Sequence, residues 1–327
     1  MAKLKVGVIG VGALGRHHAR LYKASENCEM VGVFDVNHVG AQAVAAEFDL
    51  ACFEDMNDLI DRCDALSIAV PATKHYDVAI KLLSRGKHLL IEKPLAVTVE
   101  DASAIVAEAE KNNLVVGVGH VERFNPAMNY LEQHNGNTRY IEAERLAPYP
   151  PERPGQHRRG VEVGVVLDLM IHDLDLVLSM VDSEVESFDA VGIPVLSETE
   201  DIASVRIKFK NGAVANVKSS RVSDTPNRCI RVFQTDAYIS LDYADCKGTV
   251  VKKGQLALAK KEVVLDKYNA LAEELEDFIS AVNETVKSGE VVPTKVPGIQ
   301  GLAAIKLALA IQDEIVAYND KYGVEFA

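Results

Sequence analysis

Polar side chains interrupt an apolar segment in the middle of the chain, LDLMIHDLDLV at residues 167–177. Asp168, His172 and Asp175 stand at positions i, i+4 and i+7, so on a helix they share a neighbouring face. The apolar residues between them recur at helical spacing and predict a core stripe. A buried carboxylate is costly unless it is paired, so this polar face must meet a partner, a metal or a ligand.

A glycine-rich stretch follows the first apolar run of the chain. Gly10, Gly12 and Gly15, with Ala13 and Leu14, form a G-x-G-x-x-G pattern that ends a strand and opens a helix. In that context the glycines permit a tight turn, a close approach to a pyrophosphate and close helix–strand packing. The free amides at the helix N-terminus supply the anion site. We expect these five residues to bind a dinucleotide; the alternative is a glycine-rich turn in a fold that binds none.

The second expected strand ends at Asp35, twenty residues after Gly15. A carboxylate at this offset accepts hydrogen bonds from the ribose hydroxyls and repels a 2′-phosphate. No arginine or lysine follows in DVNHVG at residues 35–40. The sequence therefore favours NAD over NADP.

Glu92, Lys93 and Pro94 follow the apolar run HLLI. Open α/β sheets bind their ligands at the carboxyl ends of strands, where we place these residues. Pro94 restricts Lys93 to an extended backbone and so fixes its direction. A lysine there would donate to a substrate hydroxyl and lower the pKa of a neighbouring base. The alternative is a solvated surface lysine.

The first part of the chain alternates short apolar runs with helical patterns. This alternation predicts a doubly wound parallel sheet, the Rossmann architecture, in a domain spanning residues 1–122. The expected strands are 5–9, 28–34, 65–70, 88–92 and 115–121, and the segments between them include 41–48, 78–86 and 99–113.

The pattern changes after Pro126. The expected strands are 203–209, 213–220, 228–234 and 237–243, with Asn211 and Gly212 as a hairpin signal, and two helical stretches follow at 267–287 and 298–318. We predict an α+β domain over residues 123–327, with an open, largely antiparallel sheet. Its C-terminal helix is expected to pack back on the first domain.

Composition limits the classes of partner. The chain has 327 residues, which favours two domains, and its net charge of −13 argues against nucleic acid. No apolar run is long enough to span a membrane. The apolar stretch after MAKLK is interrupted, so we interpret it as a strand and not as a signal peptide. The five cysteines form no CxxC pair, which indicates free thiols in a reducing cytoplasm.

Four motifs together resemble the Gfo/Idh/MocA family of sugar and polyol oxidoreductases. They are GVIGVGALG at 7–15, EKP at 92–94, GHVERFNPA at 119–127 and the D-x-x-x-H of residues 168–172. They occur in the family's order and spacing, and the resemblance covers essentially the whole chain. It implies a Rossmann domain, a second domain whose open sheet often mediates oligomerisation, and hydride exchange with a nicotinamide.

The resemblance also implies catalytic roles. Lys93 matches the lysine that contacts the reacting hydroxyl, and Asp168 and His172 match the pair on the substrate-domain helix. His172 would then be the base, Asp168 would orient it, and Asp175 would be structural. Two alternatives stay open for this helix: a divalent metal bound by Asp168 and His172, although no further ligand set is apparent, and a histidine satisfied within the core.

Other matched positions concern the cofactor and the pocket. Pro71, His75 and Glu92 match residues that line the nicotinamide side. Met170 departs from the glycine or small residue of many members, so the shape of the pocket is left open.

A proline-rich, basic loop at residues 146–160 concentrates arginines in an acidic protein. Arg158 and Arg159 suit bidentate contact with a phosphate, which favours an anionic substrate such as a nucleotide-diphosphate sugar. Arg123 and Asn125 are further candidates for the substrate cleft. The alternative for the loop is a solvated surface or a subunit contact, and whether it lines the pocket stays open.

A narrower resemblance, to the branch that oxidises UDP-N-acetylglucosamine at its 3-hydroxyl, predicts an NAD-dependent dehydrogenase of a UDP-N-acetyl sugar. The alternatives are a free polyol or sugar dehydrogenase of the myo-inositol type, a non-catalytic NAD-binding regulator, and a glycoside hydrolase that oxidises its substrate transiently. We expect a homodimer or homotetramer, because strands such as 213–220 and 228–234 present an apolar face that one chain cannot cover. The direction of hydride transfer is not fixed by the sequence.

Overall fold

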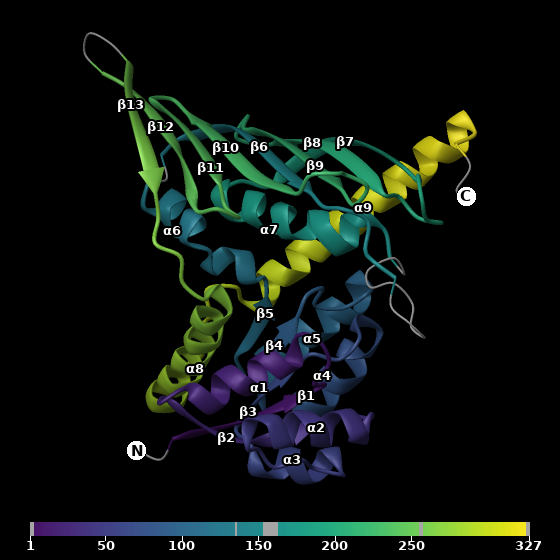
Figure 1. Ribbon diagram of the computed structural model, residues 1–327, viewed down its shortest axis with the longest axis vertical. Helices are drawn as coiled ribbons and strands as arrows, with labels where there is room; N and C mark the ends of the chain where they lie inside the picture. Colours follow the sequence, from purple (N-terminus) through teal and green to yellow (C-terminus); the bar gives the residue numbers. More distant parts are fainter. Residues whose placement is uncertain (1–2, 135, 153–162, 255–257, 325–327) are drawn as a thin grey trace. The chain divides into compact units, whose positions relative to one another are not determined.

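The computed structural model describes residues 3–134, 136–152, 163–254 and 258–324 (Figure 1). The chain forms two compact units. The first comprises residues 1–124 and 269–305, and the second comprises residues 125–268 and 306–327. No helix within the described ranges has both the length and the hydrophobicity needed to cross a membrane.

The first unit contains a five-stranded parallel sheet with the order β2-β1-β3-β4-β5. Its strands are β1 (Leu4–Ile9), β2 (Cys28–Phe34), β3 (Ala65–Ile68), β4 (His88–Glu92) and β5 (Val116–Gly119). The helices that connect them are α1 (Gly15–Ala24), α2 (His38–Phe48), α3 (Met56–Arg62), α4 (His75–Leu83) and α5 (Val99–Lys111). The strands are rich in buried Val, Ile and Leu because helices cover both faces of the sheet. The predicted Rossmann architecture is confirmed.

The strand order reverses direction between β1 and β3, which are hydrogen-bonded neighbours. Ligands of open α/β sheets bind outside the carboxyl ends of the strands at such a switch point. The glycine-rich turn follows β1 at this edge, and Val70 lies in the segment that follows β3.

The second unit contains an eight-stranded sheet with the order β13-β12-β11-β10-β6-β9-β8-β7. All neighbours are antiparallel except β6 and β9, which are parallel, so the prediction of an open, largely antiparallel sheet is confirmed. The strands are β6 (Thr138–Leu146), β7 (Val185–Ile193), β8 (Ile202–Phe209), β9 (Val214–Ser220), β10 (Asn227–Gln234), β11 (Ala237–Asp242), β12 (Lys247–Lys253) and β13 (Leu258–Val264).

Helices cover one face of this sheet. Helix α7 (Ile171–Met180) packs on β6 and β9, and α6 (Pro126–Gln133) packs on β11 (Figure 1). Ile171 and Leu174 of α7 are fully buried, as are inward-facing strand residues such as Ile141 and Val217. The sheet therefore positions α7, whose first turn contains His172.

The expected boundary near residue 122 would divide the chain at a single point. Each unit is instead formed by two separate segments of the chain. The structure assigns residues 269–305 to the first unit. The physical reason is α8 (Ala270–Ser288), whose Phe278 and Val282 enter the same core as Val8 of β1 and Tyr22 of α1. Helix α8 thus packs on the first unit, whereas α9 (Gly298–Tyr322) begins in the first unit and ends in the second.

Candidate active site

The glycine-rich turn has a backbone that only glycine tolerates at two positions. Gly10 has a φ of 85°, and a Cβ there would lie 2.7 Å from the backbone carbonyl of Ala69. A Cβ on Gly15 would collide with the carbonyl oxygen of Gly10. Gly12, in contrast, is exposed with open space around its Cα. The turn therefore fits the predicted approach of a pyrophosphate at Gly12.

The N-terminus of α1 has no side-chain cap. Leu14 occupies the capping position without a side-chain hydrogen bond, and the first turn contains no acidic residue. The first backbone N–H groups of a helix lack intrahelical partners and attract anions. Gly12, Ala13, Leu14 and Gly15 are thus placed as a phosphate-binding segment requires.

Asp35 lies against the glycine-rich turn. Its Oδ2 accepts a hydrogen bond from the Val11 amide at 2.8 Å, and its Oδ1 accepts one from the Asn37 amide at 2.9 Å. Each carboxylate oxygen has a second lone pair with which to accept from a ribose hydroxyl. Beside it, Val36 and Val39 are 85% and 80% exposed and offer an apolar surface for a base. These valines were not predicted as site residues, although apolar residues directly after the end of a strand are a signal that the sequence contains.

Glu92 and His18 form a buried pair behind the reactive loop. The His18 Nε2 lies 2.9 Å from the Glu92 Oε1, and the His18 ring is fully buried. Burial raises the pKa of Glu92, but the hydrogen bond and charge of His18, together with the charge of Lys93, outweigh it and hold the pKa below its usual value. Glu92 is therefore an ionised carboxylate inside the protein. His18 was not predicted as a site residue.

His75 links two loops of the first unit. Its Nδ1 lies 2.8 Å from the carbonyl oxygen of Pro94 and its Nε2 lies 3.0 Å from that of Val70. Burial lowers the pKa of His75, against the opposing effect of both carbonyls, and a neutral ring donates to only one of them. Pro71 is exposed just before the short 3₁₀ helix η1 (Ala72–Lys74). Contacts of Pro71 and His75 with a cofactor stay predictions, and the His75 ring nitrogens face the backbone.

Lys93 is half-buried directly after β4, and the peptide bond between Lys93 and Pro94 is cis. Arg123 is buried in η2 (Val121–Phe124) and donates to the Gln300 Oε1 at 3.2 Å. The predicted substrate contact of Arg123 is untested.

Asn125 begins α6 as its N-cap. Its Oδ1 accepts from the Ala127 amide at 3.0 Å, and its Nδ2 donates to the Tyr243 carbonyl at 2.9 Å. These bonds give Asn125 a structural role beside any contact with substrate. Arg158 and Arg159 lie outside the described residues.

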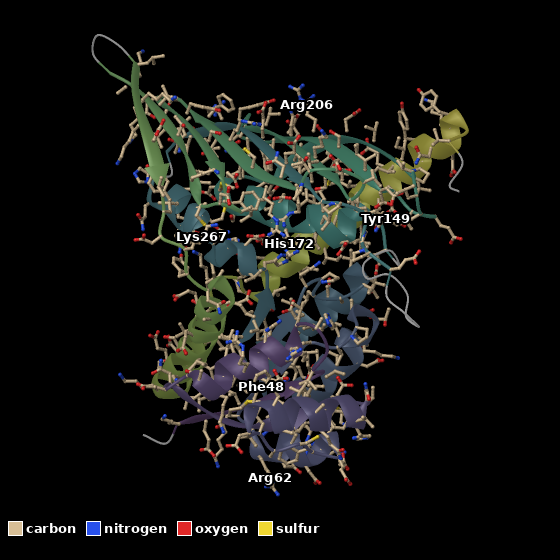
Figure 2. The ribbon with its side chains drawn as sticks, in the orientation of Figure 1. Phe48, Arg62, Tyr149, His172, Arg206 and Lys267 are labelled. Atoms are coloured by element: carbon tan, nitrogen blue, oxygen red, sulfur yellow. The ribbon has the colours of Figure 1, made fainter. Side chains whose placement is uncertain are left out.

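Asp168 and His172 lie at the junction of two kinds of helix. Asp168 belongs to a π-helical turn, η3 (Val166–Met170), and His172 to the first turn of α7 (Figure 2). Both are half-buried, whereas Met170 is fully buried and packs in the core. Single π-helical turns within α-helices occur frequently at functional sites. The sequence pattern did not predict the π-helical turn η3.

A buried ion pair anchors α7 immediately after His172. The Arg145 Nε donates to the Asp173 Oδ2 at 2.9 Å, and the Tyr243 hydroxyl donates to the Asp173 Oδ1 at 2.7 Å. The Arg145 guanidinium also lies 5.5 Å from the centre of the Tyr243 ring. Asp173 was not predicted as a site residue, because it lies outside the helix face shared by Asp168, His172 and Asp175. Asp175 is itself buried.

A second buried network anchors the start of η3. Arg221 donates from Nε to the Asp201 Oδ1 and from Nη1 to the Val163 carbonyl, both at 2.7 Å. Glu200 accepts from the Val165 amide at its backbone oxygen and from the Val166 amide at its Oε1. The residues that precede Asp168 are therefore fixed by buried charged groups.

The predicted catalytic residues come from both units. Lys93 belongs to the first unit, and Asp168 and His172 belong to the second. Across the described ranges, no three or more His, Cys, Asp or Glu side chains are grouped as a metal site would require.

Two family models match the chain. The model described as an oxidoreductase family with an NAD-binding Rossmann fold matches residues 4–120, and a GFO/IDH/MocA C-terminal domain matches residues 132–240. The chain belongs to the Gfo/Idh/MocA family. The resemblance that the four motifs predicted is thereby confirmed, and the cofactor of the first unit is NAD.

Relatives of the chain are named for different substrates. A UDP-N-acetylglucosamine 3-dehydrogenase from Acidithiobacillus ferrooxidans is 37% identical over 97% of this chain and 99% of that protein. A myo-inositol 2-dehydrogenase from Thermotoga maritima is 27% identical over 95% of this chain and 96% of that protein.

Solved structures agree with this assignment. A structure of the Acidithiobacillus ferrooxidans enzyme has a TM-score of 0.88 and 37% identity, over 97% of this chain and 99% of that chain. A levoglucosan dehydrogenase in complex with NADH has a TM-score of 0.83 and 21% identity, over 96% and 97% of the two chains. The second likeness shows the shared fold alone.

Proposed function

We propose that the protein oxidises the 3-hydroxyl of a UDP-N-acetyl sugar in an NAD-dependent reaction. The observation that carries the substrate is the 37% identity, over nearly the full length of both chains, to an enzyme named for this reaction. The first unit supports the cofactor requirement, because Asp35 lies against an unobstructed glycine-rich turn. The dehydrogenase class is shared by the other named relatives, including the myo-inositol enzyme.

Three side chains have separate roles in the proposed reaction. NAD, when bound, supplies the acceptor for the hydride that leaves the carbinol carbon. His172 takes the hydroxyl proton as general base, and Asp168, one turn earlier, orients its ring. Lys93 stabilises the oxygen of the reacting hydroxyl as its negative charge develops. The products are a ketone at the oxidised carbon, a reduced nicotinamide and a proton.

Substrate profiling tests the proposal. Purified protein is mixed with NAD and, separately, UDP-N-acetylglucosamine, myo-inositol and free hexoses, and the absorbance of NADH is followed. We expect turnover with the UDP-sugar. Turnover with free sugars alone would overturn the nucleotide-sugar assignment and favour the second candidate, a free polyol dehydrogenase, which the Thermotoga maritima relative supports.

We also infer a homo-oligomer formed through the face of the eight-stranded sheet that α7 does not cover. On this face the Phe233 ring of β10 contacts the Tyr140 ring of β6 and the Tyr238 ring of β11. Arg206 of β8 is exposed (Figure 2). An aromatic patch among charged residues suits a second copy of the same surface. Sedimentation velocity tests this: Phe233→Glu should reduce the mass of a wild-type oligomer to that of one chain. A wild-type protein that sediments as a monomer would exclude the interface.

A cytoplasmic location belongs to the same proposal. The five cysteines form no disulfide with one another. Burial raises the pKa of the Cys28 thiol to about 11 and that of Cys63 to about 12. Cysteines that form no disulfide suit a reducing compartment. Fractionation of the native cells, followed by detection of the protein, tests this location.

A further inference from the structure

We propose that His18 is a positioning residue for Lys93: it holds the Glu92 carboxylate in place as a fixed counter-ion beside the lysine. The inference deepens the proposed dehydrogenase function and rests on it. It assigns a task to a residue of the cofactor-binding helix that lies beyond the glycine-rich turn. All the residues involved belong to the first unit.

The geometry joins the two elements through one carboxylate. The Glu92 Oε1 lies 2.9 Å from the His18 Nε2 of α1, and the Glu92 Oε2 accepts from the Lys93 amide at 3.3 Å. Glu92 is thus the bridge between α1 and the residue that follows β4. One of its oxygens faces the helix and the other faces the backbone of the lysine.

Packing holds both members of the pair in a single arrangement. The His18 ring meets the Tyr22 ring edge-on, with 6.5 Å between their centres, and the Tyr22 hydroxyl is hydrogen-bonded to the Ser67 Oγ of β3 at 2.8 Å. On the other side, a Cβ added to Gly119 of β5 would lie only 3.0 Å from the Glu92 Oε2. The carboxylate is therefore largely enclosed by α1, β4 and β5.

Electrostatics explain why the histidine is needed. A buried carboxylate is unstable unless charges or hydrogen bonds compensate it. Three ionisable groups act on Glu92: His18 from α1, Lys93 from the adjoining loop, and His75 from α4. The effects of His18 and Lys93 keep the pKa of Glu92 below its usual value despite burial. Without His18, Lys93 would carry most of that compensation.

The consequence for catalysis follows from this sharing of charge. An ionised Glu92 favours the ammonium form of Lys93, which can donate to the reacting hydroxyl. Because His18 also binds the carboxylate, two groups compensate the charge of Glu92, and α1 fixes the orientation of that charge beside the lysine. His18 lies three residues after Gly15 in the same helix, so cofactor and lysine are held by one rigid element.

The test compares two neighbouring histidines. In His18→Gln, the amide can still donate to Glu92 but cannot carry a charge. His17→Gln is the matched control, because His17 is exposed on the same helix. We expect His18→Gln to lower kcat about ten-fold, equivalent to about 1.4 kcal/mol, with the KM for NAD within about two-fold of wild type. The control should leave both constants unchanged.

The pH profile separates positioning from a merely structural role. Loss of the His18 charge lets burial raise the pKa of Glu92, so the acid limb of kcat should move to higher pH in His18→Gln. In a Glu92→Gln background the same substitution should have little further effect, because the charge on which it acts is absent. A lower melting temperature with an unshifted pH profile would overturn the proposal, as would additive losses in the double variant.

A measurement without turnover keeps this inference separate from the proposed function. The ring nitrogens of His18 can be followed by NMR with ¹⁵N-labelled histidine, and the signal is assigned by its loss in His18→Gln. Glu92→Gln should change the chemical shifts of the two ring nitrogens at a fixed pH, because it alters the hydrogen bond between the ring and the Glu92 side chain, even if no sugar in the panel is oxidised. Unchanged chemical shifts would overturn the His18–Glu92 pair whatever the substrate, whereas an inactive wild-type protein would contradict only the proposed function.

Discussion

Arg145 and Asp173 form an ion pair inside the second unit, with 2.9 Å between the Arg145 Nε and the Asp173 Oδ2. The two side chains are only 4% and 0% exposed. The pair connects β6 to α7 at the residue that follows His172. The position of the predicted base therefore depends on a buried ion pair at the neighbouring residue.

Removal of one partner of this pair should destabilise the protein strongly. We expect Asp173→Ala to lower the free energy of unfolding by about 3–5 kcal/mol, because it leaves the Arg145 guanidinium buried without its carboxylate. Urea-induced unfolding measures the loss. The control is Lys218→Ala, which breaks a partly exposed pair with Glu144 and should cost at most about 1 kcal/mol. A loss as small as that of the control would show that the buried pair does not hold the helix.

Local sequence patterns predicted the features that depend only on neighbouring residues, namely the buried strands and the glycine-rich turn. Buried parallel strands appear as apolar runs, and the glycines of the turn are required by backbone geometry at Gly10 and Gly15. The strand β6, TRYIEAERL, was missed although its alternation of buried and outward-facing residues is the pattern of a half-buried strand. The strand β13 was missed because almost all of it is exposed, with lysines along an edge.

Contacts between residues far apart in the chain could not be predicted from the sequence. His18 meets Glu92 across 74 residues of chain, and Arg145 meets Asp173 across 28, so no local spacing links either pair. The amphipathic helix α8 was recognised as a helix, but its partner could not be read from its own residues. These contacts depend on how the elements pack, and they supply much of the electrostatic environment around the predicted catalytic groups.

Cofactor preference should change when the charge of Asp35 is removed. In Asp35→Ser, the carboxylate that repels a 2′-phosphate is gone, and so are its hydrogen bonds to the Val11 and Asn37 amides. We expect the KM for NAD to rise about ten-fold and the ratio of NADP to NAD efficiency to rise with it. Steady-state kinetics with each cofactor measure this. Asp77→Ser, at an exposed site on α4, is the control, and an unchanged ratio in Asp35→Ser would place the selectivity elsewhere.

Catalysis should separate from cofactor binding in Lys93→Ala and His172→Asn. We expect each substitution to lower kcat by about 10²–10⁴-fold, the range associated with a lost acid or base. The Kd for NADH, measured by fluorescence, should stay within about two-fold. Lys111→Ala, at the exposed end of α5, is the control for the loss of a positive charge. Normal turnover in Lys93→Ala would remove the lysine from the mechanism, whereas a wild-type protein that binds NADH without any turnover would favour the regulator alternative.

Acid stability should report on Asp201, the carboxylate bonded to Arg221. Burial raises the pKa of Asp201, but the backbone amide of Leu196, the Arg221 guanidinium and the Ser197 hydroxyl outweigh it and lower the pKa from 3.8 to about 2. A carboxyl whose pKa is lower in the folded state stabilises the protein above its unfolded pKa and loses that effect as the pH falls toward the folded value. The window is therefore about pH 4 to 2.

Asp201→Asn tests this linkage. Over that window, the wild type should lose about 2 kcal/mol of unfolding free energy that the variant does not lose, because the amide has no proton to gain. The variant should already be less stable at pH 7, since Arg221 keeps its buried charge. Urea unfolding at a series of pH values gives both curves, and their difference cancels carboxylates common to both proteins. Parallel curves would mean that Asp201 does not bind its partners as an ion, and the anchor of the turn before Asp168 would then require another cause.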